Sequence, residues 1–127
     1  SNWERNDTVF DKIGTGMSES SGIFTFPSTG IWYVSFHAIA TGAASDYIST
    51  KIHVTENNST YVNRAESYQN TVAASDYVGI LTNLFVDVSN TSNVKVKFFT
   101  DTGAGITIKG DTSRNETWVN FIRLGDT

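Results

Sequence analysis

The feature that most constrains the fold is a run of ten residues, 31–40, that is apolar at both phases of a strand alternation. Its even-numbered positions form a continuous apolar row: Trp32, Val34, Phe36, Ala38 and Ala40. On the opposite face, Ile31, Tyr33 and Ile39 are also apolar. A strand with two apolar faces must be covered on both of them. The run therefore predicts a central strand that is buried from two sides.

Two further segments share this two-sided character, and the other strand signals have one polar face. Residues 77–88 and 117–124 are apolar at both phases, so we expect 77–88 to neighbour 31–40. The remaining strands are expected at 8–13, 22–26, 47–55, 60–68 and 94–99. About eight strands with no helical period indicate an all-β fold, a two-sheet antiparallel jelly-roll sandwich.

A tight turn is expected immediately before the central strand. Pro27 presets its own φ there, and Gly30 can take a positive φ if the turn requires one. The strand 22–26, the turn and the central strand together predict a hairpin.

The three two-sided strands also predict self-association. A two-layer sandwich in solution has one wet face per sheet, whereas a sheet built from these strands is apolar on both faces. Further copies of the chain are the simplest cover, and we expect a homotrimer. The large side chains expected in the core or the trimer interface are Trp32, Tyr33, Phe36, Phe85, Trp118 and Phe121. The pattern leaves open which face is core and which is interface.

Length and composition restrict the class of protein. A chain of 127 residues fits a single domain, residues 1–127, that can bury a core. The absence of Cys excludes disulfides, zinc–thiolate sites and thiol catalysis. A net charge of −4 disfavours nucleic acid and anionic membranes as partners, and no apolar run suggests membrane insertion. We expect a domain of a longer protein, or a processed product.

Three segments resemble the C1q/TNF-like jelly-roll domain family: FDKIG at 10–14, GIFTFPSTGIWYVSFHA at 22–38 and WVNFIRLGD at 118–126. The resemblance implies a compact homotrimer with strands at the threefold axis and both termini at its base. The closing FIRLGD and the Asn/Thr-rich composition are similar to C1q-like tips of bacteriophage and other viral fibres.

If the strands alternate in direction from the base, the long connections all fall at the far end. These are 14–21, 41–46, 69–76 and 102–116, and the tight base turns are 27–29, 56–59 and 89–93. Long loops on a rigid scaffold commonly carry binding. We therefore expect a recognition face at the distal end.

A five-residue motif, AASDY, occurs twice among these loops, at 43–47 and 73–77. The candidate ligand-binding residues are Asp46, Tyr47, Asp76, Tyr77 and Asp111. The candidate ligands for calcium are Asp46, Asp76, Asp101 and Asp111. The alternative for each carboxylate is turn capping. The tyrosines at strand ends offer either stacking faces for sugars or walls for the core rim: Tyr47, Tyr61, Tyr68 and Tyr77.

Nothing in the sequence assembles a catalytic site. His37 and His53 are the only histidines, and no nucleophile or paired carboxylate is placed beside either. We expect a non-enzymatic, trimeric recognition or adhesion head, the tip of a viral or phage fibre that binds a host-surface glycan or protein. Its place would be extracellular or on the virion surface. The alternative is a soluble C1q/TNF-type ligand or a structural trimerisation cap.

Overall fold

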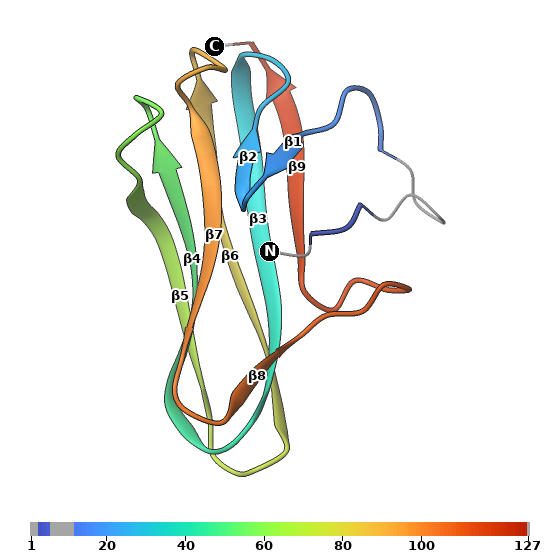
Figure 1. The fold of residues 1–127 in the computed structure, drawn as a ribbon, viewed down its shortest axis with the longest axis vertical. Helices are drawn as coiled ribbons and strands as arrows, with labels where there is room; N and C mark the ends of the chain where they lie inside the picture. The colour runs from blue at the N-terminus through green and yellow to red at the C-terminus, as the bar shows by residue number, and fades with distance from the viewer. Residues whose placement is uncertain (1–2, 6–11, 127) are drawn as a thin grey trace.

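The computed structural model describes residues 3–5 and 12–126. Its strands are β1 Ser18–Ser20, β2 Ile23–Thr25, β3 Gly30–Gly42, β4 Ser45–Thr55, β5 Val62–Thr71, β6 Asp76–Val88, β7 Lys95–Thr102, β8 Ile106–Lys109 and β9 Trp118–Gly125. They form two antiparallel sheets that face each other in a sandwich (Figure 1). The predicted all-β, two-sheet jelly-roll class is confirmed. No helix long and apolar enough to cross a membrane occurs in the part of the chain that the structure describes.

The four-stranded sheet is built around β3, the strand that the two-sided pattern singled out. β6 pairs with β3 along its whole length, from Gly30 opposite Val88 to Gly42 opposite Asp76. On the other edge, β9 pairs with the first half of β3 and β8 pairs with its last residues. The three two-sided strands are therefore neighbours in one sheet, and the predicted pairing of 77–88 with the central strand is confirmed.

The five-stranded sheet has the order β1-β2-β7-β4-β5. Its inner face meets that of the four-stranded sheet in a core of aliphatic and aromatic side chains. One polar link crosses this core, because the hydroxyls of Thr50 and Thr82 lie 2.6 Å apart. Polar groups buried in this way are normally hydrogen-bonded, as these two are.

The structure decides which face of β3 is the core. Trp32 and Phe36 are 6% and 2% exposed, and they point between the sheets. Phe121 joins them from β9, with its ring 5.4 Å from that of Phe24. Three of the six large residues predicted for core or interface thus lie in the core. The other three, Tyr33, Phe85 and Trp118, belong to the opposite phase and face outward.

The predicted hairpin of 22–26 with the central strand is wrong. β2 pairs with β1 and β7 in the five-stranded sheet, so the turn at 27–29 crosses from one sheet to the other. This arch lets Phe26 on one side and Trp32 on the other fill the same interior, with ring centroids 5.3 Å apart. Gly30 takes φ +129°, where a Cβ would lie 2.3 Å from the carbonyl oxygen of Gly125. The need for glycine at this turn is confirmed.

Two segments expected as loops contain strands. β1 lies within 14–21 and pairs with β2, and β8 lies within 102–116 and pairs with the end of β3. Short strands of three and four residues carry too little alternation to be distinguished from loop. The predicted strand 8–13 falls mainly outside the described residues, and its last two positions, 12 and 13, are not in a strand.

Candidate functional site

Three of the four connections expected at the distal end do meet there, at the lower end of the molecule in Figure 1. The amide of Ala43 donates to the carbonyl of Gly105 at 3.1 Å, and the amide of Ser75 donates to the carbonyl of Gly42 at 3.0 Å. The Thr71 hydroxyl donates to the carbonyl of Ala43 at 2.7 Å. We call the region that they build the distal surface; it comprises residues 42–47, 71–77 and 103–105.

The other predicted distal segments lie elsewhere. The β1–β2 hairpin and the segment 110–117 run along the flank of the sandwich in Figure 1, so their placement at the distal end was wrong. At the opposite end, the amide of Asn58 donates to the carbonyl of Asn93 at 3.0 Å. The predicted base turns 56–59 and 89–93 therefore meet, as expected.

The two AASDY copies both reach the distal surface but have different local structures. Asp76 accepts the amides of Val72 and Ala73, each at 2.9 Å, and so caps the turn before β6. Asp46 lies on β4 and is exposed, and no side chain among the described residues hydrogen-bonds to its carboxylate. Asp76 therefore acts as a turn cap, which was the alternative to ligand binding. Of the two aspartates, Asp46 is the one whose carboxylate is accessible to a ligand.

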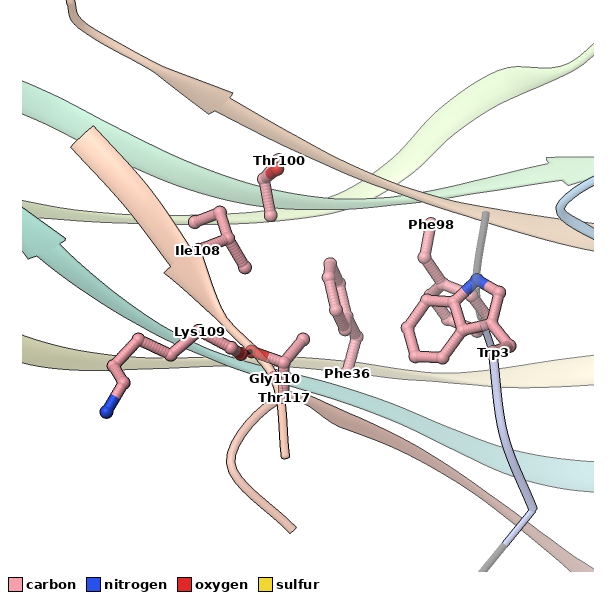
Figure 2. Close-up of a pocket in the computed structure, with 8 residues that line it drawn as sticks. All are labelled: Trp3, Phe36, Phe98, Thr100, Ile108, Lys109, Gly110 and Thr117. Carbon is pink, nitrogen blue, oxygen red and sulfur yellow. Dashed lines mark hydrogen bonds between the residues drawn. The ribbon is translucent and has the colours of Figure 1, made fainter. Parts of the chain in front are cut away.

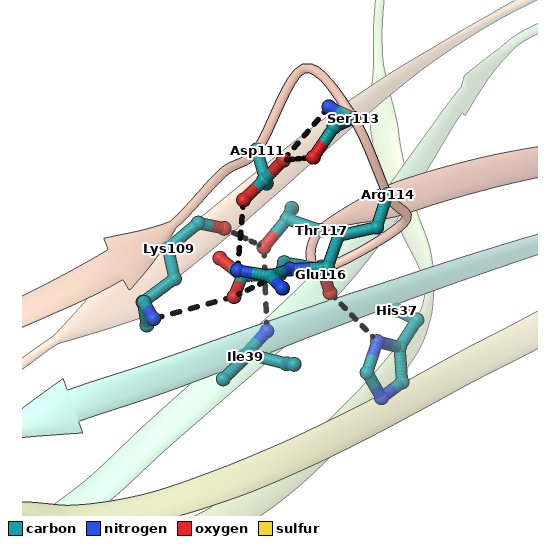
Figure 3. A network of polar contacts seen from close by, with 8 residues as sticks. All are labelled: His37, Ile39, Lys109, Asp111, Ser113, Arg114, Glu116 and Thr117. Atoms are coloured by element: carbon teal, nitrogen blue, oxygen red, sulfur yellow. Dashed lines mark hydrogen bonds and ion pairs between the residues drawn. The ribbon is translucent and has the colours of Figure 1, made fainter. Parts of the chain in front are cut away.

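Asp111 belongs to a polar network on the segment 110–117 (Figure 3). Its carboxylate accepts the amide and hydroxyl of Ser113 and pairs with Arg114 at 3.0 Å. These hydrogen bonds, first of all that from the Ser113 hydroxyl, hold the pKa of Asp111 below its usual value. Arg114 also contacts Glu116, which pairs with Lys109 at 3.3 Å. These contacts all lie within residues 109–116, so Asp111 stabilises the conformation of this segment.

The same network reaches the distal surface through Lys109. The Lys109 ammonium lies 5.4 Å from the ring centroid of Tyr77, within the range of a cation–π contact. Tyr77 is 66% exposed and lies on the outer side of β6. Tyr47, 46% exposed, shares the strand phase of Ser49 and faces outward from the five-stranded sheet. The two candidate tyrosines therefore lie on opposite sides of the sandwich.

Asp101 lies on the outer face of the five-stranded sheet, opposite Ser49 and two residues before the distal segment 103–105. It pairs with the Lys51 ammonium at 3.2 Å, and Lys51 pairs with Glu66 at the same distance. Hydrogen bonds to Glu66 and Asp101 raise the pKa of Lys51. Desolvation alone would raise the pKa of Glu66. Hydrogen bonds from Tyr68, Lys51 and Asn63 outweigh desolvation and hold the pKa below its usual value. These directions keep Lys51 and Glu66 charged near neutral pH.

The four carboxylates proposed for calcium do not form one site. Asp76 caps a turn, Asp101 pairs with Lys51, Asp111 pairs with Arg114 and Asp46 stands apart from all three. No group of three or more His, Asp or Glu side chains that could hold a metal ion occurs within residues 3–5 and 12–126. Calcium coordination requires several oxygen ligands around one point, and these carboxylates do not provide it together.

The outer face of the four-stranded sheet carries apolar rows that cross three strands. Tyr33 on β3 lies opposite Phe85 on β6 and Ile122 on β9. The rings of Tyr33 and Phe85 are 5.5 Å apart. Phe85 and Ile122 are 66% and 51% exposed, and Leu81 and Leu124 are also exposed on this sheet. We call this region the apolar face.

His37 lies between Leu81 and Trp118 on the same outer face, and a polar row of Asn83, Ser35 and Asn120 separates this row from that of Tyr33. Its ring stacks on that of Trp118 at 5.4 Å, and Nδ1 lies 3.2 Å from the carbonyl oxygen of Glu116. Gly79 leaves room for the ring, because a Cβ there would lie 3.0 Å from Nε2. His37 is therefore packed, as expected, and is not positioned as a catalytic base.

A cavity of about 380 Å³ opens between the two sheets near β8 (Figure 2). The rings of Trp3, Phe36 and Phe98 line it, and Trp3 packs edge-on against the other two at 6.2 and 6.0 Å. The Lys109 side chain extends away from these rings in Figure 2, toward its ion pair with Glu116. Thr100, Lys109, Gly110 and Thr117 complete the lining together with Ile108, so the wall of the cavity is part aromatic and part polar.

Several polar residues escaped prediction because strands distant in sequence bring them together. Lys51, Glu66 and Asp101 lie on three strands, and only the observed register shows that they meet. The alternation of each strand shows that these side chains point outward. It does not show which strands lie next to one another in the sheet. Lys109 and Glu116 lay inside a segment expected to be loop.

The fold and these surfaces define the chain as a jelly-roll sandwich without an assembled catalytic or metal site in the described residues. No protein-family model matches the chain, and no curated protein matches it in sequence. Its structure is similar to that of Eiger TNF from S. frugiperda, with a TM-score of 0.70 and 12% sequence identity. The likeness covers 87% of this chain and 70% of the other. It shows that the fold is TNF-like, which confirms the resemblance at the level of fold.

Proposed function

We propose that the chain is a homotrimeric, non-enzymatic recognition head. The apolar face is the observation that carries this proposal. Large apolar side chains that gather on an exposed face mark interaction sites. Phe85, Ile122, Leu81 and Leu124 are each about half exposed or more in the single chain. A symmetric assembly of identical chains covers three such faces at once.

Recognition then falls to the distal surface, which three connections build at the end of a rigid sandwich. Asp46 offers an exposed carboxylate, and Tyr47 and Tyr77 offer exposed rings. Tyrosine combines an apolar ring with a polar hydroxyl, which suits sugars and protein surfaces alike. A trimer presents three copies of each loop, so weak individual sites gain avidity on a surface with many ligands. Asp76 and Asp111 are the other two proposed binding residues. Asp76 holds the loop before β6 in place, and Asp111 belongs to the polar network that contacts Tyr77 through Lys109.

The parent assembly that we propose is the tip of a viral or phage fibre, which binds a host-surface glycan or protein outside the cell. The Asn/Thr-rich composition and the closing FIRLGD favour this setting. The TNF-like fold supports a second candidate equally, a soluble TNF-type ligand or a trimerisation cap. In either case the chain acts extracellularly or on a virion surface, and its partners are itself and one surface ligand.

The test has two parts, and the first is sedimentation velocity in dilute buffer. We expect a single species of about three times the monomer mass. A monodisperse monomer would overturn the trimer.

The second part is binding of the intact head to a glycan array and to host cells. Asp46→Ala and Tyr77→Ala should abolish binding while the trimer mass and melting curve stay unchanged. The matched controls are Asn58→Ala and Asn90→Ala at the opposite end. If the control variants lose binding and the distal variants keep it, recognition lies at the base turns and the proposed distal surface is wrong.

A further inference from the structure

The outer face of the five-stranded sheet carries an array of side chains that the proposed recognition surface does not use. The register places residues of β5, β4 and β7 side by side in three rows. The rows are Tyr68–Ser49–Asp101, Glu66–Lys51–Phe99 and Asn63–His53–Lys97. We call these nine residues the aromatic–polar face.

Aromatic rings are exposed at two corners of this array. Tyr68 is 64% exposed and Phe99 is 45% exposed. The His53 ring lies 4.6 Å from that of Phe99, which holds it from one side. Adjacent strands are about 4.8 Å apart and two residues along a strand span about 6.8 Å, so the two exposed rings, two strands and one row apart, start from backbone positions separated by roughly 12 Å. The face therefore offers two stacking platforms with polar groups between them.

Hydrogen-bonding groups of both kinds fill the space between the rings. The Lys51 ammonium lies 3.2 Å from both Glu66 and Asp101, and the Asn63 amide donates to Glu66 at 2.9 Å. The Ser49 hydroxyl lies on the outward phase of β4 at 0% exposure, and no partner within the described residues hydrogen-bonds to it. A buried hydroxyl without a partner is costly and rare. The hydroxyl has no exposed surface, so it lies beneath the side chains that a ligand would touch.

The charges of the face balance. Lys51 and Lys97 carry two positive charges, and Glu66 and Asp101 carry two negative charges. A strongly anionic ligand would meet the two carboxylates, and a strongly cationic one would meet the two ammonium groups. The face complements a neutral ligand that has C–H faces for stacking and hydroxyls for hydrogen bonds. A neutral oligosaccharide has both, because one side of a pyranose ring presents polarised C–H groups to the negative face of an aromatic ring.

We propose that the aromatic–polar face is a second binding site, separate from the distal surface, and that it takes neutral oligosaccharides. Tyr68 and Phe99 stack on two sugar rings of one chain, and Glu66, Asp101 and Lys51 bind their hydroxyls. The site lies on the sheet opposite the apolar face. It is complete in one chain and does not depend on the proposed trimer.

The test is an NMR or calorimetric titration of the full chain with cellohexaose, maltohexaose and laminarihexaose. We expect at least one of these neutral sugars to bind. Tyr68→Ala and Phe99→Ala should each weaken that binding roughly threefold to tenfold, and the double variant should lose it. Asn90→Ala is the control: it changes an exposed residue in a base turn, outside both proposed binding surfaces, and should leave binding unchanged.

Three outcomes would overturn the proposal. None of the three sugars binds, or the Tyr68 and Phe99 variants bind like the parent chain, or an acidic oligosaccharide such as oligogalacturonate binds more tightly than the neutral ones. Because Asp46→Ala tests the distal surface alone, failure of one site is distinguishable from failure of the other.

Discussion

The two outer faces of the sandwich are built by the same alternation and carry opposite chemistry. On β3 the outward positions place Tyr33 between Phe85 and Ile122, three large side chains in one row. On β4 the outward positions place Lys51 between Glu66 and Phe99, a charged pair beside one ring. Both faces expose aromatic rings. On the second, the charged groups beside the rings pair with one another: Lys51 lies 3.2 Å from both Glu66 and Asp101.

This difference separates two uses of an exposed ring. A row of apolar side chains gains free energy when another protein surface excludes water from it. A ring beside Lys51, Glu66 and Asp101 is flanked by groups that stay hydrated, so covering it with an apolar surface would leave those groups without water. The apolar face therefore suits a second copy of the chain, and the aromatic–polar face suits a polar ligand.

The largest effect is expected from the side chains between the two faces. Phe36→Ala removes a ring that is 2% exposed and packs 5.2 Å from that of Phe98, and it should lower the free energy of unfolding by about 3–5 kcal/mol. Phe99→Ala, one residue from Phe98 but on the outer face, should cost less than about 1 kcal/mol. Denaturant unfolding of both variants measures the contrast. Equal losses would show that Phe99 belongs to the core.

The next effect tests self-association. Phe85→Lys places a charge in the middle of the apolar face, which the partner chains would have to bury without a counter-ion. We expect the assembly to dissociate to monomers in sedimentation velocity. Phe99→Lys is the matched substitution on the other face and should leave the assembly intact. Dissociation by Phe99→Lys alone would mean that the roles of the two faces are exchanged.

The sequence predicted the members of each face better than it predicted their neighbours. Alternation identified Trp32 and Phe36 as one row and Tyr33 as the other, because side chains along a strand point to opposite sides with period two. It did not decide which row was core, since both are apolar. The missing information was in the partner strands: Phe98 on β7, about 60 residues along the chain, packs against Phe36 of the Trp32 row.

Connections were harder to predict than strands, for a related reason. The turn at Pro27–Gly30 has the residues of a tight turn, and those residues permit both a hairpin and an arch between sheets. The partner of β2 decides between them, and that partner, β7, lies about 70 residues further along the chain. The repeated AASDY motif likewise shows that a local sequence does not determine its own structure. Asp76 caps a turn, whereas Asp46 lies in a strand.

A smaller effect should sharpen the description of the apolar face. Gly79→Ala puts a Cβ 3.0 Å from Nε2 of His37, so the ring must shift from its stacking contact with Trp118. We expect a loss of about 1 kcal/mol in the free energy of unfolding, since small overpacking costs are of this order. Gly110→Ala is the control, because its added Cβ would meet nothing within 4 Å. If both substitutions lower the melting temperature equally, the loss in Gly79→Ala does not come from the contact with His37.

The smallest effect concerns the charges of the aromatic–polar face and appears only in acid. Desolvation favours the neutral form of Glu66, but hydrogen bonds from Tyr68, Lys51 and Asn63 outweigh it and hold the pKa below its usual value. The unfolded chain therefore binds more protons than the folded chain as the pH falls past the ordinary glutamate pKa of about 4.3. The stabilisation by Glu66 is present above that pH and is lost as the pH falls through the lower pKa of the folded state.

Glu66→Gln should accordingly reduce the acid-induced fall in the denaturation midpoint between about pH 5 and pH 3, with little change at higher pH beyond the loss of one surface ion pair. Gln69→Ala, on the same strand, removes no titrating group and should leave the acid slope as it is. If Glu66→Gln shows the parent slope, the contacts of Glu66 with Lys51 and Tyr68 contribute nothing to folding. The charges of this face would then be free to serve a ligand, and the contrast with the apolar face would rest on Tyr68 and Phe99 alone.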